Sequence, residues 1–173
     1  MNVAEIRSLF AYNHWANRRL LSAARHLSPE DFIRDLQSSH SSVRGTFVHI
    51  IGGHWVWLRL WSGEPSKQIV ARCDALWDPE KFSDIASLEA AHASLEDDQI
   101  SFIEKLTDER VNARRSFENF QGKRWELSLS EMMHHVVNHS TYHRGQVVTL
   151  LRQLGAVSPG TDLSTFLIEG PAA

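Results

Sequence analysis

Four segments of the chain carry the 3.6-residue hydrophobic periodicity of amphipathic helices, and no stretch between them alternates long enough to form a central sheet. The predicted helices cover about residues 3–27, 43–62, 84–106 and 128–154. The last helix has the clearest ends, because Ser128 and Glu131 form a capping-box pattern and Gly155 follows as a terminator. The chain is therefore predicted to be all-α.

The connections between the predicted helices have sequences typical of turns and loops. A Ser-Pro-Glu-Asp run at residues 28–31 ends the first helix, and residues 38–42 form a linker whose serines offer an N-cap to the second. The polar stretch at 63–83 contains two prolines and is long enough for a crossover. Residues 114–127 predict a short hairpin with Gly122 in its turn, directly before the last helix.

Composition limits the class of protein. The 173 residues, 42% hydrophobic and 23% charged, fit one globular domain covering 1–173. The net charge of −3, with dispersed lysines and arginines, predicts no nucleic-acid partner. The longest apolar stretch, 47–61, is interrupted by two histidines and an arginine, so no membrane span is expected. One cysteine, Cys73, and a first segment unlike a signal peptide predict a cytoplasmic location.

The second predicted helix is apolar on all sides. Such a helix is normally covered on more than one face, which in a small helical protein suggests a partner chain. Gly52 and Gly53 stand at its middle, where each glycine costs about 1 kcal/mol relative to alanine. Either a close backbone approach or space for a ligand explains this pair, or it is a tolerated weak spot.

The last predicted helix carries a stripe of histidines at metal-ligand spacing. His135, His139 and His143 follow one another at intervals of four residues, in a chain with ten histidines. The outer two stand roughly 12 Å apart along the axis, so only one adjacent pair can chelate a given ion. Ser140 occupies the position of the general-base glutamate in zinc proteases, so a protease mechanism is not expected.

A third ligand has to come from another element, and the second helix offers His49 and His54. Five residues turn a helix through about 500°, so only one of the two can face the last helix. The periodicity slightly favours His54 as the inward residue, and spacing alone does not decide between them.

Several motifs in chain order resemble the DinB/YfiT-like family, and the resemblance covers the whole chain. The His-Arg-Gly-Gln ending is the most specific of them. The motifs are Tyr12-Asn13-x-Trp15-Ala16-Asn17, Val48-His49-Ile50, Phe120-x-Gly122, Asn138-His139-x-x-x-His143-Arg144-Gly145-Gln146 and Thr161-Asp162-Leu163. The resemblance implies an up-down-down-up four-helix bundle, usually a homodimer.

The resemblance also implies a single metal held by three histidines, which fall on His49, His139 and His143 and replace the slight preference for His54. Zinc and nickel are the expected ions, because neutral imidazole suits both. His54 then becomes a core or pocket residue. His14 occupies a variable position of the first motif, and His26, His40 and His92 match none. These four are expected to be surface or packing residues.

Three nitrogen ligands with an open position are typical of a catalytic metal site. The DinB-like family includes enzymes that transfer low-molecular-weight thiols such as bacillithiol and mycothiol, so the resemblance implies a metal-dependent thiol S-transferase acting on a small-molecule electrophile. Trp15, Trp55 and Tyr142 either line an apolar pocket or, as aromatic residues at helical spacing more often do, pack in the core, and Tyr142 and Arg144 are the residues expected to assist the reaction. Arg144 either holds a carboxylate of the cosubstrate or braces the bundle.

Two other functions remain open. Metal-dependent hydrolysis needs a carboxylate base near the ion, and Glu126 or Glu131 at the hairpin end are the candidates. A non-catalytic metal protein with a role in stability or stress response would instead have a closed site, with His54 or His135 as the fourth ligand.

Overall fold

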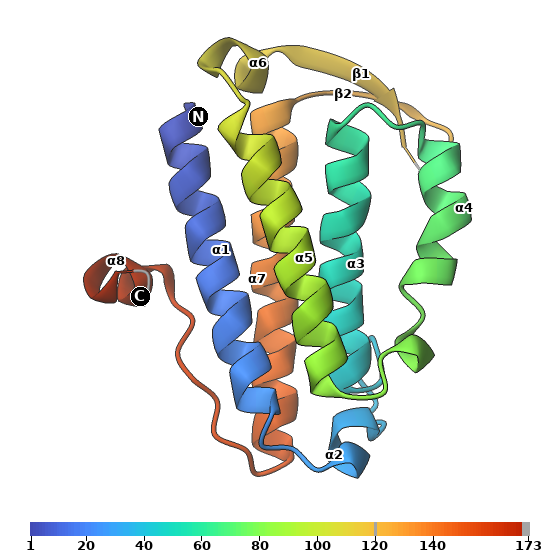
Figure 1. Cartoon of the computed structure of the whole chain (residues 1–173), viewed down its shortest axis with the longest axis vertical. Helices are drawn as coiled ribbons and strands as arrows, with labels where there is room; N and C mark the ends of the chain where they lie inside the picture. Colours follow the sequence, from blue (N-terminus) through green and yellow to red (C-terminus); the bar gives the residue numbers. More distant parts are fainter. Residues whose placement is uncertain (120, 171–173) are drawn as a thin grey trace.

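Four long helices lie side by side in the described part of the chain, residues 1–119 and 121–170 of a computed structural model (Figure 1). The helices are α1 (Val3–Ala24), α2 (Pro29–Ile33), α3 (Val43–Trp61), α4 (Ser66–Leu76), η1 (Pro79–Lys81, a 3-10 turn), α5 (Ile85–Glu104), α6 (Asp108–Asn112), α7 (Leu129–Gln153) and α8 (Leu163–Glu169). The strands β1 (Arg114–Glu118) and β2 (Arg124–Ser128) pair antiparallel and cross one end of the long helices (Figure 1). The expectation of a mainly helical chain with a short hairpin before the last long helix is confirmed.

The ends of the long helices follow local sequence signals. The Ser42 side chain accepts a hydrogen bond from the Gly45 amide and caps α3. Ser128 and Glu131 form the predicted capping box at the start of α7. Gly122 adopts φ +75° in the hairpin turn, a backbone conformation that glycine tolerates best. Phe120, the other residue of that motif, lies outside the described residues.

Four short helices were not predicted from the sequence. Residues 28–31, expected to form a turn, lead into α2, and residues 63–83, expected to form only a polar crossover, contain α4; the segments around α6 and α8 also coil. Each of the four buries a single apolar side chain: Phe32, Ile69, Val111 and Phe166 respectively. One buried residue per element leaves no periodicity to recognise, so tertiary packing stabilises these helices.

The apolar circumference of α3 is covered largely within the chain. Its neighbours are α5, α7 and, on the outer side, α4 (Figure 1). Trp55 and Trp61 are both buried there. The all-round apolar surface of this helix is therefore no evidence for a partner chain, and dimerisation stays a prediction. In the described residues, no helix combines the length and apolar content needed to cross a bilayer.

Candidate metal centre

The packing of α3 against α7 brings His49 to His139 and His143. His139 and His143 lie one turn apart on α7, and His49 approaches them from α3. The Nε2 atom of His49 lies 3.1 Å from Nε2 of His139 and 3.1 Å from Nε2 of His143. One side chain from α3 thus meets a helical i, i+4 pair on α7.

These distances fit a shared metal ion better than hydrogen bonds between the rings. An imidazole nitrogen has one in-plane position, which holds either a proton or a lone pair, so Nε2 of His49 cannot bond to two ring nitrogens at once. Ligand atoms on a tetrahedral zinc ion, with bonds of about 2.0–2.1 Å, stand about 3.3 Å apart. The three Nε2 atoms therefore have the chemistry, and for the two measured pairs the spacing, of a metal site.

The electrostatics of the cluster favour neutral rings. Desolvation, followed by the repulsion of neighbouring imidazoles, lowers the pKa of His49 to about 3. The same two causes, in the same order, lower the pKa of His139 to about 4. Because a metal binds the neutral imidazole, these two residues are available as ligands without losing a proton at neutral pH.

Gln146 orients one of the three rings. Its Oε1 atom accepts a hydrogen bond of 2.7 Å from Nδ1 of His143, which favours the tautomer in which Nε2, the nitrogen that faces His49, holds the lone pair. Such outer partners of ligating histidines fix the tautomer and the ring orientation. No role for Gln146 was predicted, although its i, i+3 spacing from His143 places the two side chains on one face of a helix.

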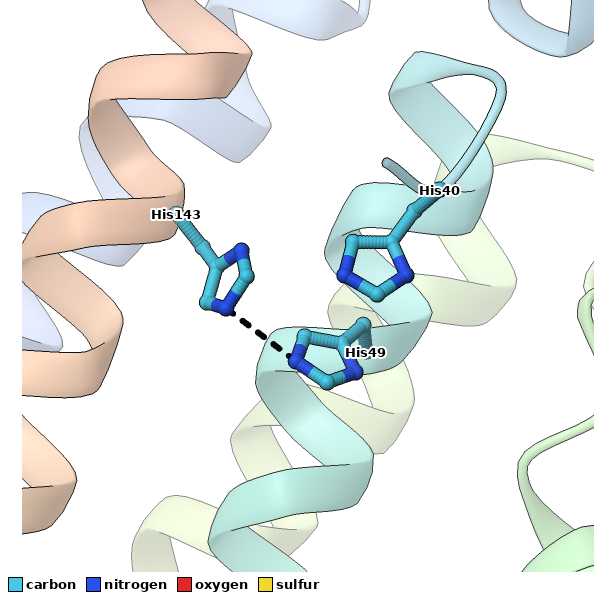
Figure 2. A group of neighbouring side chains, drawn as sticks. All are labelled: His40, His49 and His143. Carbon is cyan, nitrogen blue, oxygen red and sulfur yellow. Dashed lines mark hydrogen bonds between the residues drawn. The ribbon is translucent and has the colours of Figure 1, made fainter. Parts of the chain in front are cut away.

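A fourth imidazole, that of His40, joins the cluster from the linker before α3, as Figure 2 shows. The ligand atoms of His40, His49 and His143 lie within 4.8 Å of one another. This set overlaps the predicted triad in two members and contains His40 in place of His139, whereas the 3.1 Å contacts of His49 are made with His139 and His143. The expectation that His40 is only a surface or packing residue is therefore incomplete. The position of His40 in the sequence gave no indication of where the linker would place its ring.

A cavity of about 450 Å³ adjoins the histidines. Trp57 and Trp77 supply its aromatic walls, and the Cys73 thiol also lines it. Gly53 borders it as well, where an added Cβ would stand 3.4 Å from Cε1 of His139. At Gly52 a Cβ would stand only 3.0 Å from Cγ of Trp77, so this glycine permits a close approach of the indole ring to α3.

The aromatic residues expected around the site lie elsewhere. Trp15 is buried between α1 and α8, with its ring 5.6 Å from that of Phe166, so the prediction that it lines the pocket is wrong. Trp55 is buried next to Trp77 and does not line the cavity. Tyr142 is 67% exposed and meets the His143 ring edge-on from outside the cavity. Periodicity identified buried aromatic residues but not the surface that they face.

Arg144 is buried between α1 and α7. Its guanidinium group donates to Oδ1 of Asn13 at 2.6 Å, to Oδ1 of Asn17 at 3.1 Å, and to the Tyr12 and Thr141 hydroxyls. Among the described residues it forms no ion pair with a carboxylate. These contacts match the expectation that Arg144 braces the bundle. They do not match the alternative that it holds a cosubstrate carboxylate, because a side chain that is 1% exposed is not accessible to a cosubstrate.

His54 belongs to a separate polar network in the core. Its Nε2 atom is hydrogen-bonded to the Ser140 hydroxyl, and its Nδ1 atom lies 3.5 Å from Nε2 of Gln99. Gln99 in turn contacts Nε2 of His14 at 2.9 Å. Because Ser140 lies on α7, His54 also faces that helix, and the expectation that only one of His49 and His54 would do so is wrong. His54 nevertheless lies outside the His49 cluster, whereas His135 lines the cavity against Trp57.

The two carboxylates that were candidates for the hydrolytic base form other contacts at the hairpin end of the long helices. Glu126 pairs with Arg114 at 3.0 Å, and Glu131 caps α7 through Ser128. Asp74 is the acidic residue that lines the histidine cavity.

A mainly helical fold with histidines gathered between two long helices defines the class of this protein. The sequence model of the DinB family matches residues 1–170, and the chain belongs to this family. It is 28% identical over 159 residues to Protein DinB of Bacillus subtilis strain 168, covering 92% of this chain and 91% of that protein. It also resembles the crystal structure of a DinB-like protein from Bacillus cereus ATCC 10987, with a TM-score of 0.57, 16% identity, and coverage of 84% of this chain and 90% of that one.

Proposed function

We propose that this DinB-family protein is a metal-dependent enzyme that transfers a low-molecular-weight thiol to an electrophile. His49, His139 and His143 hold one divalent transition metal, with zinc and nickel as the ions best suited to imidazole ligands. The observation that carries this proposal is the approach of Nε2 of His49 to within 3.1 Å of two other ring nitrogens beside a cavity.

A divalent metal in such a site lowers the pKa of a thiol and so supplies a thiolate at neutral pH. The protein residues bind and orient the reactants. Trp57 and Trp77 offer apolar surface to the electrophile, and Gln146 holds the His143 ring in place. Tyr142 lies on the outer side of His143, where it assists only reactants that reach the exposed edge of that ring.

Hydrolysis is the second candidate, because Asp74 lines the same cavity and offers a carboxylate base. The two activities differ in their dependence on an added thiol. A transferase rate rises with thiol concentration, and a hydrolase rate does not.

Membership of the DinB family supports the remaining parts of the proposal, which concern topology, location and oligomeric state. The chain forms one domain with an up-down-down-up bundle, which is supported by α1 and α7 running one way and α3 and α5 the other in Figure 1. It acts in the cytoplasm as a homodimer on a small molecule, with neither nucleic acid nor membrane as a partner.

The first test is the metal content of the untagged protein, measured by elemental analysis. Roughly one ion per chain is expected in the wild type, and each of His49→Ala, His139→Ala and His143→Ala should lower the metal content, because each change removes one ligating imidazole. His26→Ala, which changes an exposed histidine outside the cluster, is the matched control. Full metal content in any of the three variants would overturn the ligand assignment.

A further inference from the structure

We propose that His40 is a displaceable fourth histidine ligand of the centre, which leaves a stacked position on His49 to occupy the coordination position that the other three leave open. This inference rests on the proposed metal site and adds regulation to it. His40 lies in the linker before α3, outside the DinB-family motifs of the sequence.

The first observation is the position of the ring. The His40 imidazole stacks on that of His49 with centroids 3.9 Å apart and an interplanar angle of 19°. Its centroid lies 5.2 Å from that of His143 (Figure 2). The ligand atoms of the three residues lie within 4.8 Å of one another, so a nitrogen of His40 is within a side-chain rotation of the other donors.

The stacking itself excludes simultaneous coordination by His40 and His49. An ion lies close to the plane of each imidazole that binds it, and two nearly parallel planes have no common point near the donor atoms. His40 must therefore leave the stack to become a ligand. The structure thus contains one arrangement of His40, and rotation of its side chain produces the other.

The second observation is the strained backbone on both sides of His40. Gln37 and Ser41 adopt φ angles of 57° and 60°, which are uncommon for residues other than glycine. Hydrogen bonds hold this turn, from the Leu36 amide to the Ser41 carbonyl at 2.8 Å and from the Ser41 amide to the Ser38 carbonyl at 3.0 Å. Strain of this kind persists where the surrounding structure needs a particular geometry.

The third observation is the fit between the linker and α3. The His40 carbonyl accepts a hydrogen bond of 2.7 Å from the Ser42 amide. A Cβ atom at Gly45 would stand 2.1 Å from the same carbonyl oxygen, a distance at which the linker would have to move. Glycine at position 45 therefore permits the backbone of His40 to rest against the first turn of α3.

A contact between Ser39 and Gln146 connects the linker to α7. Ser39 Oγ lies 3.4 Å from Nε2 of Gln146, whose Oε1 atom holds the His143 ring. The backbone beside His40 is thus tied to the residue that orients a proposed ligand. The His40 ring itself is only half-buried, so it has room to rotate while its backbone stays fixed. A fixed backbone with a mobile ring is what a displaceable ligand requires.

His40 and an incoming donor atom would therefore compete for one coordination position. With no substrate bound, His40 closes the site and protects the ion from adventitious ligands. A thiol or other donor entering the cavity displaces the ring, which returns to the stack on His49.

The test uses cobalt(II) loaded into the chelator-treated full-length protein, because the visible spectrum of cobalt(II) reports the number and type of its ligands. His40→Ala removes the ring, and His40→Phe keeps a ring that can stack but has no donor nitrogen. Both variants should shift the visible band and lower cobalt(II) affinity by at least about tenfold. Far-UV circular dichroism checks that both variants are folded.

Two results would overturn the proposal. If His40→Phe matches the wild type while His40→Ala does not, His40 acts only by stacking on His49. If neither variant differs from the wild type, His40 has no role at the ion. The double variant His49→Ala and His143→Ala is measured in parallel, because cobalt(II) binding that survives loss of both imidazoles would refute the metal centre itself, whatever the role of His40.

Discussion

Gln146 and His143 form a hydrogen-bonded pair on α7, with Oε1 of Gln146 2.7 Å from Nδ1 of His143. The contact determines which nitrogen of His143 carries the proton. Gln146 belongs to the most specific family motif. It is not a proposed metal ligand, but it orients the ring of one proposed ligand, His143.

Replacing Gln146 should weaken metal binding without abolishing it. Gln146→Leu removes the acceptor, so the His143 ring loses its preferred tautomer, and metal affinity is expected to fall about 10–100-fold. Gln146→Glu keeps an acceptor and should retain most of the affinity. Competition titration against a chromophoric chelator measures both constants, and equal affinities for the leucine variant and the wild type would contradict the orienting role.

The two neighbouring glycines of α3 should respond differently to alanine. Gly52→Ala places a Cβ 3.0 Å from the Trp77 ring, and overpacking of this kind costs about 1–3 kcal/mol, which outweighs or cancels the helix-propensity gain of about 1 kcal/mol. Gly53→Ala has a 3.4 Å contact with His139 and should be neutral or slightly stabilising. Urea denaturation compares the two directly, and a Gly52→Ala protein as stable as the Gly53→Ala protein would show that Trp77 moves aside easily.

Arg144 should matter for stability more than for metal binding. Arg144→Ala leaves the amide oxygens of Asn13 and Asn17 without their charged donor in a buried site, and a loss of about 3 kcal/mol in the free energy of unfolding is expected. Arg144→Lys should recover little, because an ammonium group does not reproduce the guanidinium fork.

Arg152→Ala, an exposed change on the same helix, is the control for Arg144 and should stay within about 0.5 kcal/mol of the wild type. Denaturation in the presence of a chelator separates folding stability from metal binding. An Arg144→Ala protein as stable as this control would argue against the bracing role.

Acidification should destabilise the fold through histidines buried in the core. Burial lowers the pKa of His14 and His54, and lowers that of His92 to about 3. Above the unfolded pKa of about 6.5 neither state is protonated, so the stability is fully present there. As the pH falls below that value, the unfolded chain binds protons that the folded chain excludes. Stability is then lost at up to about 1.4 kcal/mol per pH unit for each such histidine, until the folded pKa is reached.

The pH effect is measured by urea unfolding of the chelator-treated protein between pH 7.5 and 5. His92→Leu removes one buried histidine and should make the decline shallower, whereas His26→Leu, at an exposed position, should leave the slope unchanged. A pH-independent free energy of unfolding across this range would contradict the prediction.

The long helices could be predicted from the sequence because the sequence patterns that indicate them are local. Periodicity, the Ser128 and Glu131 capping box and the Gly122 turn each depend on residues a few positions apart. The spacing of His139 and His143 belongs to the same category, since any helix places residues i and i+4 on one face. The short helix α4 could not be predicted, because it has one buried side chain, Ile69, and therefore no hydrophobic periodicity.

The composition of the histidine cluster was decided by tertiary structure. His49 and His54 lie on different faces of one helix, and only the packing of α3 against α7 turns His49 toward the stripe while enclosing His54 in the core. His40 and Trp77 reach the site from connecting segments whose paths depend on long-range contacts. Sequence alone therefore determined which long helices form and which of their residues share a face, because those properties repeat along one helix. Which faces meet was decided only when the whole chain packed, because burial is shared among elements distant in the sequence.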